Sequence, residues 1–187
     1  LGWESGVKVQ AVLRSGGGQR PTVVGFTEVE GLAPEEYAQR ATPFGELVCI
    51  DPTDRFRLET DQETVEPRVV ELMAPIGKGQ RCLIVAPPKA GKTILLQQLA
   101  HAIGVNHPEV TIFVLLVDER PEEVTDWKRR VVRGEVFASS SDRSTQNHIE
   151  VSEIVLDRAR RMVELGQHVV VFMDSLTRMS RAYNNAQ

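Results

Sequence analysis

The hydrophobic and polar positions of the chain change their rhythm near residue 76. Beyond that point, short apolar runs alternate with segments whose apolar residues recur at helical spacing. Apolar runs of this kind are typical of strands that are buried on both faces of a parallel sheet. We predict such strands at residues 82–86, 111–117, 135–140 and 168–174.

The segments between these runs carry helix signals. Residues 91–104 form a helical pattern that ends at a glycine, and residues 145–165 place their apolar side chains on one helical face before another glycine. Pro121 stands where a further helix can start, with Glu122 and Glu123 in its first turn. Strands that alternate with helices predict an α/β fold, a parallel sheet with helices on both faces.

The first 70 residues have a different character. Residues 6–13 and 22–29 are short β-type runs joined by a glycine-rich segment, which predicts a β-hairpin. Residues 31–68 are irregular, rich in proline and acidic residues, with one short helix expected near 34–40. The chain therefore divides into a hairpin unit, a connector and an α/β unit, at residues 1–33, 34–70 and 71–187.

Length and composition set the broad class of protein. With 187 residues and 41% hydrophobic content, the chain can form one domain of ordinary size with a core, plus a smaller piece. No apolar stretch is long enough to predict a membrane span, and no signal peptide is visible, so we expect a cytoplasmic protein. The chain starts with Leu rather than Met, which indicates a fragment or a processed chain.

Cysteines and charge add little chemistry. Cys49 and Cys82 have unrelated surroundings and no metal-ligand spacing, so we expect reduced thiols in the core of a cytosolic protein. The net charge is −4, with an acidic first part and a slightly basic remainder. Neither part has the basic excess of a protein that binds nucleic acid by charge alone, so composition neither shows nor excludes such contact.

The connection that follows the first apolar run carries the clearest chemistry. Its sequence, APPKAGKT, matches the phosphate-loop pattern G-x-x-x-x-G-K-[ST], except that Ala86 replaces the first glycine. Backbone N–H groups at a helix N-terminus attract anions, and Gly91 lets the backbone approach closely. Lys92 supplies a positive charge for the β- and γ-phosphates, and the Thr93 hydroxyl can bind Mg²⁺. The alternative is a Gly-Lys turn that only caps a helix, but the position between strand and helix favours nucleotide binding.

A bound Mg²⁺ also calls for a carboxylate at the tip of an apolar strand. The run at 168–174 ends in Asp174, which we predict as the second metal residue beside Thr93. Arg178 and Arg181 follow at helical spacing, so both can face the same site. The alternatives are a solvated aspartate at a strand end and ordinary surface arginines.

Hydrolysis needs a group that orients or deprotonates the attacking water. The run at 111–117 ends in Asp118, Glu119 and Arg120, at the edge where parallel α/β sheets bind ligands. We predict Glu119 as the general base, with Asp118 next, and Arg120 as a sensor of phosphate charge; Glu119 and Lys92 are the catalytic candidates. The alternative is a set of helix N-terminal charges on a solvated loop.

Several segments together resemble one family. The sequences LIVAPPKAGKT, VLLVDERPEEVTDWKR, GEVFASSSD and VVVFMDSLTRMSRAYN are similar to those of the bacterial transcription termination factor Rho family. Upstream, ELMAPIGKGQR resembles the entry to its ATPase domain, and FGELVCIDPTDRFRLET resembles its interdomain connector. Residues 7–40 resemble the last two strands of its RNA-binding OB domain and the exit from it.

The resemblance implies a fold and an activity. The fold would be a RecA-like P-loop domain with a truncated parallel sheet, preceded by a β-hairpin remnant of an OB fold. The activity would be that of a homohexameric, RNA-dependent ATPase and 5′-to-3′ RNA–DNA helicase that ends transcription. Its cofactors would be ATP and Mg²⁺, and its partners single-stranded nascent RNA and the RNA polymerase complex, with no membrane.

The resemblance also implies site residues. Glu119 is similar to the catalytic glutamate, and Arg120 and Arg178 to arginines that sense the phosphates. Cys82 stands where the family usually has glycine, and the family's RNA-gripping loops and arginine finger would lie beyond Gln187. The nucleotide site would be lined by Gly77, Lys78, Gly79, Gln80, Arg81, Cys82, Lys89, Ala90, Gly91, Lys92, Thr93, Ile94, Arg120 and Arg178.

Two other functions stay open at this point. One is a different RecA-like motor, such as a rotary ATPase subunit, which would share the Gly-Lys-Thr sequence and the aspartate at a strand end. The other, for this chain alone, is a nucleotide-binding module without turnover.

Overall fold

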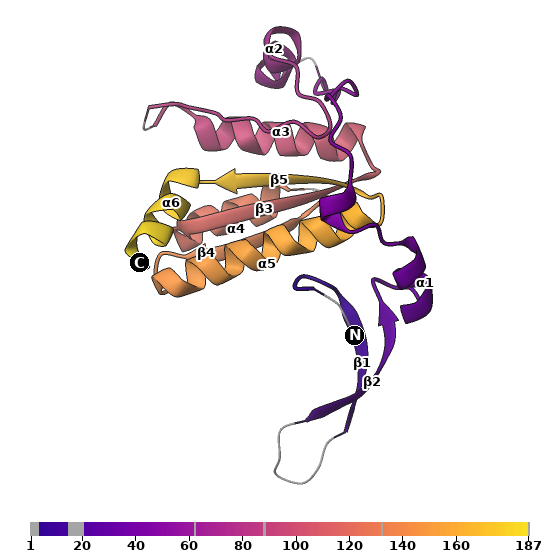
Figure 1. Ribbon diagram of the computed structural model, residues 1–187. Helices are drawn as coiled ribbons and strands as arrows, with labels where there is room; N and C mark the ends of the chain where they lie inside the picture. The colour runs from indigo at the N-terminus through magenta and orange to yellow at the C-terminus, as the bar shows by residue number, and fades with distance from the viewer. Residues whose placement is uncertain (1–3, 15–20, 62, 88, 132, 187) are drawn as a thin grey trace.

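A three-stranded parallel sheet in the order β4-β3-β5 forms the centre of the protein (Figure 1). The computed structural model describes residues 4–14, 21–61, 63–87, 89–131 and 133–186. The parallel α/β class predicted from the sequence is confirmed, as are three of the four predicted strands. These strands, β3, β4 and β5, cover Val110–Glu119, Glu135–Ser140 and His168–Asp174.

Helices cover both faces of this sheet, as the alternation of strands and helices predicts (Figure 1). On one face lie α3 (Lys92–Asn106) and α4 (Pro121–Arg130). On the other lies α5 (Thr145–Glu164), with α6 (Leu176–Asn185) beside it. α4 begins at the predicted proline, and acidic residues occupy its first turn, where they complement the helix dipole.

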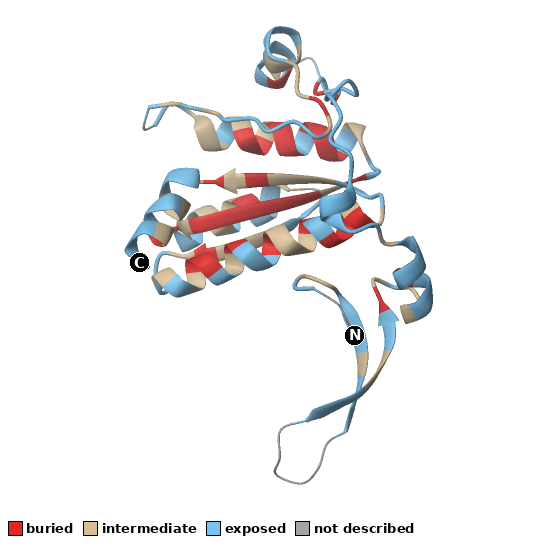
Figure 2. Ribbon diagram, viewed as in Figure 1, coloured by how far each residue is buried: buried red, intermediate tan, exposed pale blue. Residues whose placement is uncertain are grey.

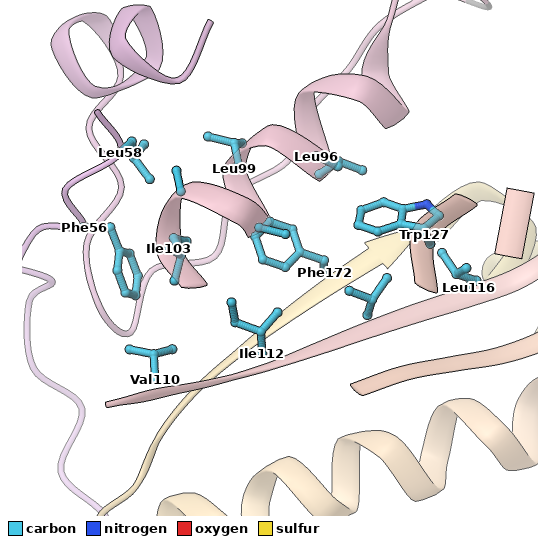
Figure 3. Close-up of a cluster of buried hydrophobic side chains, with 13 residues drawn as sticks. Phe56, Leu58, Leu96, Leu99, Ile103, Val110, Ile112, Leu116, Trp127 and Phe172 are labelled. Carbon is cyan, nitrogen blue, oxygen red and sulfur yellow. The ribbon is translucent and has the colours of Figure 1, made fainter. Parts of the chain in front are cut away.

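β3 is buried along almost its whole length (Figure 2). Since successive side chains of a strand point to opposite faces, they enter two separate cores. The first core lies against α3 and α4 and contains Leu116, Trp127 and Phe172 (Figure 3). The second lies against α5 and contains Leu115 and Val155. This double burial explains why the sequence of β3 is almost continuously apolar.

The predicted strand at residues 82–86 is wrong. This segment joins neither sheet, and Leu83 and Val85 are 72% and 84% exposed. Ile84, which lies between these two exposed residues, packs its side chain against the first core. An apolar run predicts burial, but a strand also needs a neighbouring strand to take its backbone hydrogen bonds, and local sequence does not specify that neighbour.

The predicted hairpin is confirmed near the N-terminus. β1 (Val9–Arg14) and β2 (Thr22–Val29) pair antiparallel, with Val9 opposite Val29. The glycine-rich join at 15–20 lies outside the described residues. α1 (Pro34–Arg40) follows as expected, and then a 3₁₀ turn, Phe44–Glu46.

The connector is more ordered than its composition suggests. The sequence pattern does not predict α2 (Val65–Met73), because the acidic, proline-rich sequence around it favours a linker. Phe56 and Leu58 are buried in the first core (Figure 3). The Asn106 side chain at the end of α3 donates to the carbonyls of Arg57 and Glu59, both at 2.9 Å. This part of the connector is therefore packed onto the α/β unit.

The hairpin is held against α5. Glu30, whose side chain is 3% exposed, forms an ion pair with Arg158. A Cβ added at Gly6 would come within 2.4 Å of the backbone at Asp157, so only glycine fits there. Further along, the Phe44 N–H donates to Glu164 Oε1 at 2.8 Å. The C-terminal half of α5 thus binds both the hairpin and the segment after it.

Two smaller expectations have different outcomes. Cys49 and Cys82 are both free thiols, as predicted, but both are exposed rather than in the core, because each lies in an irregular, poorly covered segment. None of the helices in the described ranges combines the length and apolar character that crossing a bilayer requires.

Candidate nucleotide-binding site

The N-terminus of α3 and the C-terminal end of β5 bring three predicted residues together. α3 starts at Lys92, directly after Gly91, which adopts a left-handed φ of 88°. A Cβ there would meet no protein atom within 4 Å, so within the protein this position favours glycine for its backbone angle. Asp174 is the last residue of β5, at the edge of the sheet that faces this turn.

The Asp174 carboxylate joins the two loop residues. It is 2% exposed, accepts a hydrogen bond from Lys92 Nζ, and accepts another from Thr93 Oγ1 at 2.9 Å. The ammonium of Lys92 compensates the buried negative charge, which would otherwise be costly. One lysine cation and two oxygen groups therefore converge at one point at the start of α3.

Glu119 reaches the same edge of the sheet through an irregularity in β3. The register against β4 shifts between Val117 and Glu119, and Asp118 adopts a left-handed φ of 57°. Such a bulge redirects the side chain that follows it. Glu119 is consequently buried, at 4% exposure, although it ends a strand. Sequence patterns give no signal for this bulge.

Burial dominates the electrostatics of Glu119. It raises the pKa of the Glu119 carboxyl to about 8, and a hydrogen bond with Glu123 acts in the same direction, while the charge of Arg178 opposes both. Arg178 lies 2.9 Å from Glu119 Oε2 as an ion pair and donates to the Asp118 carbonyl. The predicted base therefore has a cation and a second carboxyl as neighbours.

Other predicted residues lie less close to this centre. Arg120 is the exposed residue before α4, and Arg181 is exposed on α6. Lys89 and Ala90 are exposed in the turn before α3, and Ile94 is exposed in its first turn. The structure therefore brings five predicted residues to one edge of the sheet, Lys92, Thr93, Asp174, Glu119 and Arg178, and leaves the others named in this paragraph exposed.

The segment Gly77–Cys82 lies at the opposite end of α3. Lys78 Nζ is 3.0 Å from Asp54 and 3.1 Å from Glu109, which follows the end of that helix. The Gly77 N–H donates to Gln80 Oε1 at 2.9 Å, and the neighbouring Gly79, Arg81 and Cys82 are exposed. A 15-residue helix is about 22 Å long at 1.5 Å per residue, so the structure does not bring this segment to Lys92.

Sequence reasoning missed a set of polar residues beside the site. A hollow of about 340 Å³ opens between α3 and α4. Helical spacing is the signal that could have identified these polar residues, because Gln97 lies one turn after Thr93 and Asp126 one turn after Glu122. The hollow is lined by Thr93, Gln97, Glu122, Glu123 and Asp126.

Comparison with known proteins places this geometry in a family. Residues 67–187 match the nucleotide-binding domain of the ATP synthase alpha/beta family. The chain belongs to this family. The match covers the sheet, the phosphate loop and both strand-end carboxylates.

Individual relatives agree with the resemblance seen in the sequence. The chain is 53% identical over 170 residues, 90% of its length, to the transcription termination factor Rho of Streptomyces coelicolor. It is 55% identical over 164 residues to Rho of Mycobacterium tuberculosis, and 53% identical over 164 residues to Rho of Aquifex aeolicus. The matched regions cover 88% and 87% of this chain. They span only 40%, 27% and 38% of these three relatives.

Proposed function

We propose that this chain binds Mg²⁺–ATP at the N-terminus of α3 and, in the intact protein, hydrolyses it to drive an RNA-dependent motor that ends transcription. The observation that carries the proposal is the Asp174 carboxylate held between Lys92 and Thr93. A strand-end carboxylate in contact with the lysine and the hydroxyl of a phosphate loop is the arrangement that nucleoside triphosphates and Mg²⁺ require.

The residues present fit a Mg²⁺ ion with triphosphate. Magnesium prefers oxygen ligands and is usually held by one or two protein oxygens together with substrate phosphates and water. Thr93 Oγ1 and Asp174 Oδ2 are 2.9 Å apart and supply such oxygens. When bound, the ion would neutralise charge on the phosphates. Within the described residues there is no cluster of three or more metal-binding side chains that would suggest a different metal.

Lys92 and the loop backbone bind the phosphates. In the structure the lysine ammonium neutralises Asp174. Phosphate oxygens at the helix N-terminus offer it a second anionic partner, while the N–H groups of the first turn point to the same place. Lys92 therefore contributes charge to binding, and Asp174 holds that charge in position until the nucleotide arrives.

Glu119 and Arg178 are the groups that act on the attacking water and on developing charge. Glu119 is deprotonated only in part near neutral pH, because burial raises its pKa to about 8. The charge of Arg178, 2.9 Å from Glu119 Oε2, favours the charged carboxylate, which can accept the water proton. The ion pair between them keeps the base and its activating cation in contact.

The similarity to Rho supports the larger role. The relatives are named as transcription termination factors, and the matched regions cover 90% and 88% of this chain. We therefore propose single-stranded nascent RNA and the RNA polymerase complex as partners, translocation from 5′ to 3′, a homohexameric ring and a cytoplasmic location. The hairpin at 1–33 is proposed as the end of an OB-type RNA-binding domain.

The two alternatives differ in support. The match to the ATP synthase alpha/beta family supports the first alternative, a rotary ATPase subunit. Identity of 53% over 90% of the chain to Rho favours the RNA-dependent motor instead. For the chain by itself, nucleotide binding without turnover is the second candidate, since it spans less than half of each of these relatives.

The test is ATP turnover by the intact protein, with and without cytidine-rich RNA. RNA should stimulate ATP turnover by the intact protein without substitutions, called the parent below. Glu119→Gln should still bind the nucleotide. Its hydrolysis rate should be lower by a factor on the order of 10²–10⁴, the usual range for loss of a general base. A parent without RNA stimulation would contradict the proposed motor. A decrease of less than about tenfold in single-turnover hydrolysis would exclude Glu119 as the base and make Asp118 the next candidate.

A further inference from the structure

One hydrogen-bonded pair links the helix of the phosphate loop to the helix that follows Glu119. Gln97 lies one turn after Thr93 on α3 and is 5% exposed. Its Nε2 donates to Asp126 Oδ2 on α4 at 2.9 Å. The other oxygen of Asp126 accepts from Arg130 Nε, also at 2.9 Å. Both carboxylate oxygens of Asp126 are therefore engaged, and one of them bridges the two helices.

The position of this pair relates it to the chemistry on either side. Gln97 and Asp126 line the same hollow as Thr93 and Glu123. α3 begins with the lysine and the hydroxyl that face the phosphates. α4 begins two residues after Glu119, and its Glu123 lies close enough to that carboxyl to raise its pKa. The separation of the two helices thus sets the separation between the phosphate loop and the proposed base.

Apolar packing alone does not fix that separation. Leu96 and Trp127 are in the same core and hold the two helices together. Hydrophobic contact is non-directional, whereas a hydrogen bond has a preferred length and direction. A buried amide whose partner is removed is also costly, so the Gln97 side chain is committed to Asp126. The polar pair supplies the geometry that packing leaves open.

We propose that Gln97 and Asp126 are positioning residues for ATP hydrolysis, whose hydrogen bond holds the phosphate-binding end of α3 at a fixed distance from Glu119. The inference rests on the proposed function for its chemistry. Neither residue touches the Lys92–Asp174 contact, so weakening the pair changes the placement of the reacting groups more than the binding of the nucleotide. A misplacement of about 1 Å can lower a rate on the order of 10²-fold.

An exchange of the two functional groups tests the pair. Gln97→Glu places two carboxylates opposite each other and breaks the bond without changing side-chain size. Adding Asp126→Asn lets the new amide donate to the carboxylate at position 97 and still accept from Arg130. The double variant also keeps the net charge of the pair at its original value. Gln97→Met removes the hydrogen bond without adding charge, which separates geometry from electrostatics.

The expected pattern is a split between kcat and KM in the intact protein. Gln97→Met and Gln97→Glu should lower kcat by about tenfold to 10²-fold while KM for ATP changes less than about threefold. The exchanged pair should return kcat to within about threefold of the parent. A purely structural role would lower thermal stability in both single variants and leave kcat of the folded fraction unchanged. That result, or an exchanged pair no better than Gln97→Glu, would overturn the inference.

A second readout separates this inference from the proposed function. Hydrogen exchange of the backbone amides in the second turn of α3, beside Gln97, requires no turnover. Exchange should be faster in Gln97→Glu and should return to the parent rate in the exchanged pair. If the parent hydrolyses no ATP, the proposed function fails, and amide exchange still decides whether the pair holds α3. If the parent hydrolyses ATP and both single variants keep its kcat, only the positioning role fails.

Discussion

At the scale of single residues, the site depends on how two buried carboxylates are neutralised. Asp174 has a lysine ammonium and a hydroxyl as partners, so its charge is compensated inside the fold. Glu119 has Arg178 on one side and Glu123 on the other, and burial outweighs the arginine. The first carboxylate is suited to hold cations, and the second to exchange a proton near neutral pH.

The titration of Glu119 predicts a pH dependence of stability. Its pKa is about 8 in the folded chain, compared with an ordinary value of 4.5. Between these values the folded state binds more protons than the unfolded state, so this residue makes stability fall as pH rises from about 4.5 to 8. Urea unfolding at pH 5 and pH 8.5 should show a smaller loss of stability in Glu119→Gln than in the parent. Equal losses in both proteins would contradict the assigned pKa.

At the scale of elements, local patterns explain which predictions succeeded. β4, β5 and α4 begin where the sequence predicts, because apolar runs, a proline at a first helical turn and acidic first-turn residues act locally. The failed strand at 82–86 and the unpredicted α2 depend on non-local partners. The bulge at Asp118, which buries Glu119, is likewise set by pairing between strands.

The same limit applies to the candidate site. Motif spacing found Lys92, Thr93 and Asp174, because a phosphate loop and a strand-end carboxylate are local features. The link between Gln97 and Asp126 joins residues 29 positions apart in two helices. Helical spacing relates each residue to its own helix, but the contact between them follows only from the packing of α3 against α4.

The docking of the hairpin on α5 gives a prediction at this scale. Arg158→Met leaves the Glu30 carboxylate buried without its cation, which should lower the free energy of unfolding by on the order of 3 kcal/mol. Arg40→Met is the matched control, since its ion pair with Glu36 is exposed and should contribute less than about 1 kcal/mol. Chemical denaturation of both variants measures the difference. Similar values for the two would show that the ion pair does not hold the hairpin in place.

At the scale of the whole molecule, this chain combines one phosphate-binding site with a hairpin and an ordered connector. The hairpin packs on the C-terminal half of α5, while the phosphate loop lies at the sheet edge where β3 and β5 end (Figure 1). The chain covers 40% of the Streptomyces coelicolor relative and less of the others described above. Transition-state charge in phosphoryl transfer is often neutralised by an arginine, which contributes roughly 10³–10⁵ in rate.

Residues 1–187 by themselves should therefore bind Mg²⁺–ATP weakly and show no RNA-stimulated turnover. The chain spans 40% or less of these relatives, so we propose that full activity needs elements outside residues 1–187. Apolar side chains such as Leu83 and Val85 are exposed, which favours self-association over ring assembly. The test measures ATP turnover with cytidine-rich RNA for residues 1–187 and, under the same conditions, for the intact protein. RNA stimulation of the chain to near the intact rate would show that the outside elements are dispensable.

The central claim is that ATP binds where Lys92, Thr93 and Asp174 meet, and titration calorimetry of Mg²⁺–ATP into the intact protein tests it most directly. Lys92→Ala removes the only full positive charge in contact with Asp174 among the described residues, so tight binding should be lost. Lys128→Ala, an exposed lysine on α4, is the control and should bind like the parent. Unchanged ATP affinity in Lys92→Ala would contradict the assignment of the site.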